Sequence, residues 1–127
     1  MAIVSVQNAE AYRDDLLDSA IAAHFEALGV ANDLQPGMKV LLKPNLLCRA
    51  APQRAITTHP AVFGAVAKLL REAGYQHLSY GDSPGNPTTS PVKAAETAGI
   101  AVRCGRQFWK KLPGCTGKES LKGTSSG

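Results

Sequence analysis

Two short polar segments carry the residues best suited to chemistry. Lys43-Pro44-Asn45 combines an ammonium with an amide, and Gly81-Asp82-Ser83-Pro84-Gly85 combines a carboxylate with a hydroxyl. The glycines of the second segment would let a ligand approach backbone N–H groups, which favours anions such as phosphate or carboxylate. The same residue types also build sharp turns with exposed polar side chains, so the residues alone leave both interpretations open.

A third polar segment is Thr57-Thr58-His59-Pro60. An imidazole at this place can act as a general acid or base, or as a metal ligand. It can also cap a helix that starts at Pro60, the position where proline suits a first helical turn. No ligand spacing joins Cys48, His59 and Asp82, so the sequence predicts no metal site.

The elements that must position these segments follow from the hydrophobic pattern. Strand-like runs alternate with helical stretches, and they lie at residues 2–6, 38–42 and 75–80, with a fourth run beginning at 100–102. This alternation predicts an α/β fold of βαβ units with a mainly parallel, Rossmann-like sheet of three to four strands. The continuous apolar run at 38–42 is typical of a strand covered on both faces.

Helix signals separate these runs. Asn8 is the expected cap of the first helix, an apolar stripe runs from Leu17 to Leu28, and Gly29 is the expected stop. The second and third helices are expected to begin at Pro60 and Pro91. In an open parallel sheet, ligands collect beyond the carboxyl ends of the strands, so residues 43–45 and 81–85 are expected to face one crevice.

The charge of the chain divides at residue 102. The whole sequence carries a formal charge of +4, but residues 1–102 hold eight basic and nine acidic residues, whereas residues 103–127 hold six basic and one acidic. The predicted domains are therefore an α/β domain at 1–102 and a basic, low-order tail at 103–127. No basic stripe interleaved with aromatics lies in the α/β part, so we expect no nucleic-acid partner.

The cysteines and the hydropathy pattern indicate the compartment. The three cysteines are widely spaced, without a C-x-x-C pair, and reduced thiols in a cytoplasmic protein are the simplest interpretation. The sequence shows no secretion signal and no apolar run long enough to cross a membrane. We therefore expect a cytoplasmic location and no membrane partner.

Four ordered motifs carry a resemblance to a known family. They are residues 39–47, 55–60, 69–74 and 81–85, and with them the chain resembles the domain-of-unknown-function family 362 over roughly residues 2–102. Members are longer prokaryotic α/β proteins, and many carry a ferredoxin-like segment that binds 4Fe-4S clusters. The resemblance implies a redox or electron-transfer role for full-length relatives. The candidate ligand-binding residues, most of them at motif positions, are Lys43, Asn45, Thr58, His59, Asp82, Ser83 and Gly85.

Two departures from the family pattern matter. The cluster-binding cysteines are absent, so we expect no cofactor in this chain and 4Fe-4S clusters only in longer relatives. Relatives would continue in strands and helices where this chain becomes basic and loses its periodicity. We hypothesise that residues 103–127 come from a truncated or frame-shifted reading of a longer gene, which translation of the downstream DNA in all three frames would test.

Three functions stay open from the sequence. The first is a fragment of an iron–sulfur-linked redox protein that binds a small anionic molecule or a redox partner. The second is a non-catalytic α/β module that binds a small anion. The third is an enzyme that uses Lys43 and Asp82 as acid and base; no catalytic residue is assigned, and whether the chain is an enzyme is left open.

Overall fold

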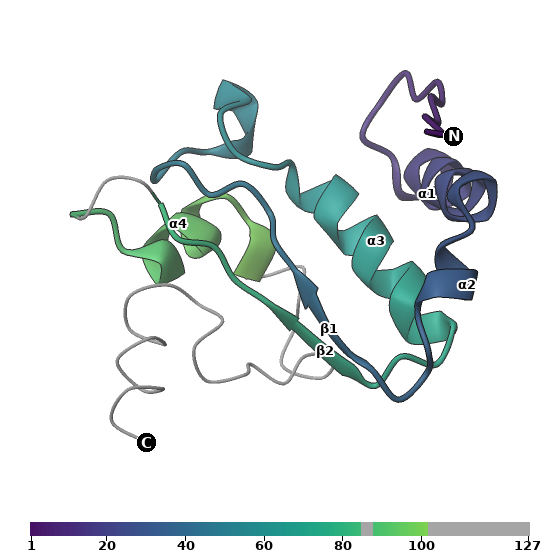
Figure 1. Cartoon of the computed structure of the whole chain (residues 1–127). Helices are drawn as coiled ribbons and strands as arrows, with labels where there is room; N and C mark the ends of the chain where they lie inside the picture. The colour runs from purple at the N-terminus through teal and green to yellow at the C-terminus, as the bar shows by residue number, and fades with distance from the viewer. Residues whose placement is uncertain (85–87, 102–127) are drawn as a thin grey trace.

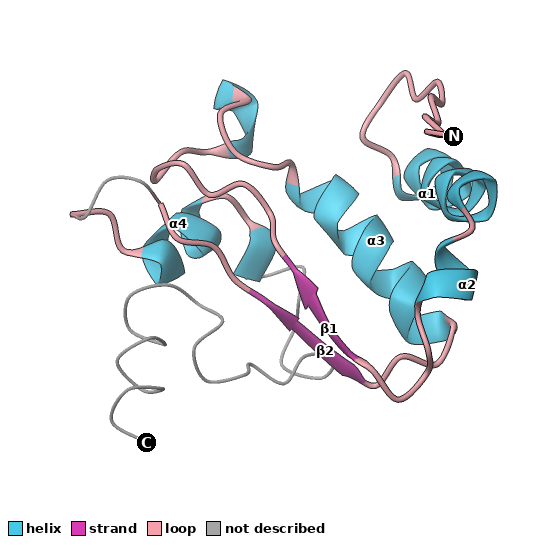
Figure 2. Cartoon of the chain, viewed as in Figure 1, coloured by secondary structure: helices cyan, strands magenta, loops and turns pink. Residues whose placement is uncertain are grey.

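Residues 1–84 and 88–101 are described in the computed structural model, which shows a mixed helix and strand fold (Figures 1 and 2). The candidate residue Gly85 and the predicted tail lie outside these ranges. In chain order the elements are α1 (Asp14–Leu28), α2 (Val30–Asp33), β1 (Lys39–Leu42), the 3-10 turn η1 (Pro52–Arg54), α3 (Pro60–Glu72), β2 (His77–Tyr80) and α4 (Pro91–Thr97).

The sheet of the described residues has two parallel strands. β1 pairs with β2 in a register that aligns Lys39 with His77 and Leu42 with Tyr80. The chain leaves β1, passes through η1 and α3, and returns to β2, so the predicted parallel βαβ unit is present at this point. Within residues 1–84 and 88–101 a sheet of three to four strands is not seen, and residues 100 and 101, where a fourth strand was expected to begin, are helical.

The N-terminal run at residues 2–6 is not a strand, which corrects the sequence prediction. Ile3, Val4 and Val6 are 63%, 84% and 85% exposed. The run lies beside α1 rather than along the sheet (Figure 1). A 2.8 Å contact between Ser5 Oγ and His24 Nδ1 joins the run to α1. β-branched residues favour extended backbone, but a strand also needs a neighbour with free N–H and C=O groups.

The first helix starts later than the sequence predicted. α1 begins at Asp14, after Arg13 in extended conformation, and Asn8 does not cap it. Asp14 and Asp15 lie in the first turn, where the positive end of the helix dipole favours carboxylates. The predicted stop is confirmed, because Gly29 adopts a left-handed φ of 64° and its N–H bonds to Glu26 O.

Both later helices begin where the Pro signals predicted. His59 caps α3 through Nδ1, which accepts the Ala61 N–H at 3.1 Å, and Ser90 caps α4 by accepting the Lys93 N–H at 3.4 Å. Each cap satisfies a backbone donor that the helix itself leaves free. These two starts fix the helices relative to the strands that precede them.

The helices cover one face of the sheet. Val40 and Leu42 of β1 pack with Leu78 of β2 against a cluster built on Leu70 and Tyr75, and α3 runs along this side (Figure 2). On the other face of β1, Leu41 is 54% exposed. The prediction of a strand covered on both faces is therefore wrong at Leu41 of β1, although Ser79, its partner on the same face of β2, is 0% exposed.

A second cluster lies at the carboxyl end of the sheet. Leu46, Ile100 and Phe63 are each at most 4% exposed, and they pack with alanines of α4 and with Leu42 and Tyr80. The Phe63 and Tyr80 rings meet edge to face with centroids 5.5 Å apart. The cluster includes Leu42, Leu46 and Tyr80, which flank the two polar segments in sequence, so it fixes where these segments lie.

Candidate functional site

The two polar segments that follow β1 and β2 meet at one edge of the sheet, as the sequence predicted. Because the strands are parallel and Leu42 pairs with Tyr80, residues 43 and 81 leave the sheet side by side. The Gly81 N–H extends the pairing by one step, donating to Leu42 O at 3.1 Å. The two polar segments therefore lie close enough to form one site.

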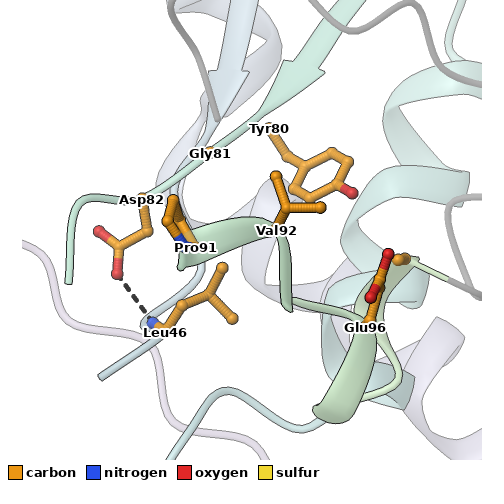
Figure 3. Close-up of a pocket in the computed structure, with 8 residues that line it drawn as sticks. Leu46, Tyr80, Gly81, Asp82, Pro91, Val92 and Glu96 are labelled. Atoms are coloured by element: carbon orange, nitrogen blue, oxygen red, sulfur yellow. Dashed lines mark hydrogen bonds between the residues drawn. The ribbon is translucent and has the colours of Figure 1, made fainter. Parts of the chain in front are cut away.

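Asp82 is the residue that joins the two segments. Its Oδ2 accepts the Leu46 N–H at 2.8 Å (Figure 3), and its Oδ1 lies 2.7 Å from Lys43 Nζ. The Asp82 side chain is 5% exposed, whereas that of Lys43 is 69% exposed. The carboxylate therefore forms a buried anchor for an ammonium that faces solvent.

The environment of Asp82 keeps it ionised. Burial by itself would raise the pKa of the carboxyl, but the Lys43 ammonium and the backbone N–H groups of Leu46 and Ser83 outweigh burial and lower that pKa below its ordinary value. Asp82 is consequently a carboxylate at neutral pH. Its negative charge positions the Lys43 ammonium through the ion pair.

Asn45 and Thr58 close the loop between β1 and α3. The Asn45 N–H donates to Thr58 Oγ1 at 2.8 Å, and the Thr58 N–H donates back to Asn45 O at 3.0 Å. The Asn45 side-chain amide also donates to Ile56 O at 3.3 Å. Both residues thus have a structural role beside the Lys43–Asp82 pair.

The other sequence candidates have separate places. His59 uses Nδ1 to cap α3, and its ring stacks on Tyr12 with centroids 3.6 Å apart and planes 3° from parallel. Ser83 is exposed, and its backbone N–H is among the groups that lower the pKa of the Asp82 carboxyl. The capping interpretation of His59 is therefore confirmed by geometry, while Gly85 lies outside the described residues.

A pocket of about 210 Å³ opens between the end of β2 and α4 (Figure 3). Its lining combines an apolar wall with Tyr80 and two carboxylates and includes no Lys or Arg; the residues are Leu46, Tyr80, Gly81, Asp82, Pro91, Val92, Glu96 and Ala101. Asp82 belongs both to this pocket and to the ion pair with Lys43. The pocket and the exposed ammonium are therefore parts of one edge.

Sequence reasoning missed Tyr80, Val92 and Glu96 as lining residues. Two signals could have found them. Tyr80 is the last strand residue before the Gly-Asp-Ser motif, and Val92 and Glu96 stand four apart, which places them on one face of a helix. Neither signal says by itself that the face borders a cavity.

The described part of the chain, residues 1–84 and 88–101, shows neither a cluster of metal ligands nor a membrane-spanning helix. Within them no group of three or more His, Cys, Asp or Glu side chains could hold a metal ion. Cys48 is a free, partly buried thiol. No helix in the same part of the chain is long and apolar enough to span a membrane.

The ordered motifs and their meeting at one sheet edge accord with the sequence comparison. The chain matches the family described as Domain of unknown function (DUF362) over residues 40–122. The chain belongs to the DUF362 family. The matched DUF362 region includes every candidate ligand-binding residue from Lys43 to Gly85, and it also runs past residue 102, so the boundary placed there stays a prediction.

A curated relative extends this finding. The chain is 42% identical over 82 residues to a thylakoid-associated protein of Synechocystis sp.. The aligned region is 64% of this chain and 25% of the relative, so the chain spans a quarter of the length of the protein it matches. No solved structure matches the chain significantly. Membership of DUF362 names the family without naming a reaction.

Proposed function

We propose that this chain supplies a binding site for a small anionic molecule at the carboxyl ends of β1 and β2. The observation that carries the proposal is the Lys43 ammonium, which is 69% exposed yet lies 2.7 Å from the buried Asp82 carboxylate. A cation fixed in position loses less side-chain entropy when it binds an anion than a freely moving lysine does. The ammonium also has three N–H donors, so contact with Asp82 leaves donors for a ligand.

The neighbouring pocket accounts for the uncharged part of such a ligand. Its wall is partly apolar, and its charged groups are the carboxylates of Asp82 and Glu96. An anionic group would be repelled from these oxygens, so it would bind the solvent-facing side of the Lys43 ammonium, away from Asp82, while the rest of the molecule enters the pocket. Ligand sites commonly combine an apolar cavity with a few fixed polar groups in this way.

Acid–base catalysis by Lys43 and Asp82 is the second candidate function. The 2.7 Å contact between Nζ and Oδ1 favours it, since proton transfer needs hydrogen-bond reach. The lowered pKa of Asp82 argues against it, because a carboxylate of low pKa is a weak base at neutral pH. We therefore place binding before catalysis.

In full-length relatives, we propose that this site works beside an iron–sulfur segment in redox or electron transfer. The support is the family resemblance of the motifs, and the clusters would be held by cysteines that this chain lacks. We propose a cytoplasmic place of action, a small molecule or a redox protein as partner, and no nucleic-acid or membrane partner. The thylakoid association in the relative's name is a property of that protein.

Calorimetric titration of the full chain with inorganic phosphate tests the binding proposal. Lys43→Gln should weaken phosphate binding about tenfold, the typical effect of losing a charge-assisted hydrogen bond. The control is Lys39→Gln, an equal charge change at the exposed amino end of the same strand, which should change affinity less than about twofold by long-range charge alone. Equal affinity in wild type and Lys43→Gln would contradict the proposal.

A separate variant distinguishes the second function. Asp82→Asn would remove the base from an acid–base pair. If a substrate were turned over and Asp82→Asn abolished turnover while binding persisted, catalysis would replace binding as the function of the pair.

A further inference from the structure

The loop between β1 and α3 is tied at its base and carries two arginines. Its ends are joined by the hydrogen bonds between Asn45 and Thr58 and between the Asn45 amide and Ile56 O. Leu46, at the start of the loop, is held by the Asp82 carboxylate. The loop therefore stands as a closed unit above the carboxyl end of the sheet (Figure 1).

The tip of the loop is ordered by its own backbone. The Arg54 N–H donates to Ala51 O at 3.0 Å, which forms η1, and Ala55 follows in a left-handed conformation with φ of 53°. A non-glycine residue in this region costs about 1 kcal/mol or more. The turn that carries Arg54 is thus defined by two backbone hydrogen bonds, from the Arg54 N–H to Ala51 O and from the Ala55 N–H to Pro52 O.

The charge of this part of the chain is one-sided. Residues 34–71 contain no Asp or Glu, and their six basic residues are Lys39, Lys43, Arg49, Arg54, Lys68 and Arg71. Arg49 and Arg54 are exposed, and among the residues that the structure describes neither makes an ion pair with a carboxylate. Two unneutralised guanidinium groups therefore stand on the loop that begins beside Lys43.

The loop closure also limits how far apart these cations begin. Lys43 and Arg54 each lie two residues from the hydrogen-bonded pair of Asn45 and Ile56. Two residues of extended chain span at most about 7 Å, and both side chains are long. The backbone positions of Lys43 and Arg54 are therefore tied to the same point at the edge of the sheet.

We propose that Arg49 and Arg54 complete the anion site, so that its ligand is a multiply charged oxyanion rather than a singly charged one. The inference rests on the proposed function of Lys43 and adds the ligand class to it. Guanidinium groups bind phosphate and carboxylate oxygens through paired N–H donors. Lys43 supplies a point charge at the sheet edge, and the loop arginines supply the fork-shaped donors for further charged groups.

Calorimetric titration of the full chain with three probes tests this inference. Pyrophosphate and citrate are multiply charged, and acetate carries one charge. Arg49→Gln and Arg54→Gln should each weaken binding of pyrophosphate or citrate about tenfold and leave acetate binding nearly unchanged. Lys39→Gln is the matched control for net charge, and the multiply charged probe that binds more tightly identifies the source as phosphate or polycarboxylate.

The outcomes separate the two proposals. If Lys43→Gln weakens binding of the multiply charged probes and neither arginine variant does, the inference about the loop is wrong and the proposed function stands. If Lys43→Gln is also without effect, both are wrong. A salt series adds a second measurement: added NaCl should weaken pyrophosphate binding more steeply in wild type than in the Arg49→Gln/Arg54→Gln double variant, and equal slopes would overturn the inference.

Discussion

At the scale of single residues, Asp82 decides how the candidate site is built. One carboxylate oxygen accepts the Leu46 N–H and the other faces the Lys43 ammonium. A buried carboxylate without such partners would be strongly unfavourable, so these two contacts are the condition for placing a charge here. The residue that positions the exposed cation is for this reason also a stability determinant.

Replacing Asp82 by Ala should lower the free energy of unfolding by about 2 kcal/mol, since a hydrogen bond to a buried charged group contributes about 1.5–3 kcal/mol. Urea denaturation followed by circular dichroism measures the change. The control is Asp33→Ala, because Asp33 is an exposed carboxylate at the end of α2. Equal stability of wild type and Asp82→Ala would show that the carboxylate does not hold the loop.

The lowered pKa of Asp82 gives a pH dependence of defined sign. The folded state binds the Asp82 proton less readily than the unfolded state, whose aspartate pKa is about 3.9. The stabilisation from ionised Asp82 is therefore complete well above pH ~4 and is lost as the pH falls through the lower folded value. Unfolding experiments should show the stability gap between wild type and Asp82→Asn shrinking below pH ~4; a gap that grows on acidification would contradict this sign.

At the scale of elements, the start of α3 and the end of α4 pack closely against each other at Gly99. Gly99 follows α4 with φ of 79°, and a Cβ at this position would stand 3.3 Å from Pro60 Cγ at the first turn of α3. The close approach lets Ala98 and Ile100, both fully buried, enter the cluster around Leu46. This cluster supports the floor of the site.

Gly99→Ala should therefore destabilise the protein by about 1–2 kcal/mol from the left-handed backbone alone, and by more if the Pro60 ring has to move. Gly37→Ala is the matched control, because Gly37 has no atom within 4 Å of an added Cβ and no positive φ. Thermal unfolding of the two variants measures the difference. Similar melting temperatures would show that the junction between α3 and α4 tolerates a side chain.

At the scale of the whole molecule, the helices of the described residues cover the α3 side of the sheet, and the opposite face is buried only in part, at Ser79 of β2 with 0% exposure. Leu78 of β2 is 2% exposed under α3, whereas Leu41 of β1 is 54% exposed on the opposite face. Parallel sheets are usually covered on both faces, so the exposure of Leu41 sets β1 apart from a typical parallel strand.

The asymmetry predicts unequal responses to substitution. Leu78→Ala should cost about 2–5 kcal/mol, as for a buried leucine, whereas Leu41→Ser should change stability by less than about 0.5 kcal/mol, as for an exposed position. Chemical denaturation of both variants measures this contrast. A large loss in Leu41→Ser would mean that the outer face is covered in solution.

The sequence predicted what depends on local signals. The stop at Gly29, the start at Pro60 and the parallel pairing that brings Lys43 beside Asp82 were all readable from residue types and their alternation. The strand predictions that were wrong concern segments whose structure depends on neighbours far away in the sequence. The β-branched run at residues 2–6 can be extended anywhere, and whether it joins a sheet is decided by a neighbour that local pattern does not reveal.

The candidate site was predictable to the same extent. Residue types and strand order were enough to place Lys43 and Asp82 at one edge, but not to show that Asp82 would be buried as the anchor and Lys43 left exposed. The hydrogen bonds by which Asn45 and Thr58 close the loop could be predicted only from the path of the loop in space. The pocket needed the packing of α4, which no spacing in the sequence specifies.

The most direct test of the central claim is to map where an anion binds. Two-dimensional NMR of the isotope-labelled full chain during titration with inorganic phosphate reports on each backbone amide. We expect the anion to bind at the carboxyl ends of β1 and β2 and so to cause saturable shifts of the amides of Lys43, Asn45, Leu46 and Asp82, with little change in α1. Saturable shifts confined to α1 and α2, with the amides around Lys43 and Asp82 unmoved, would contradict it.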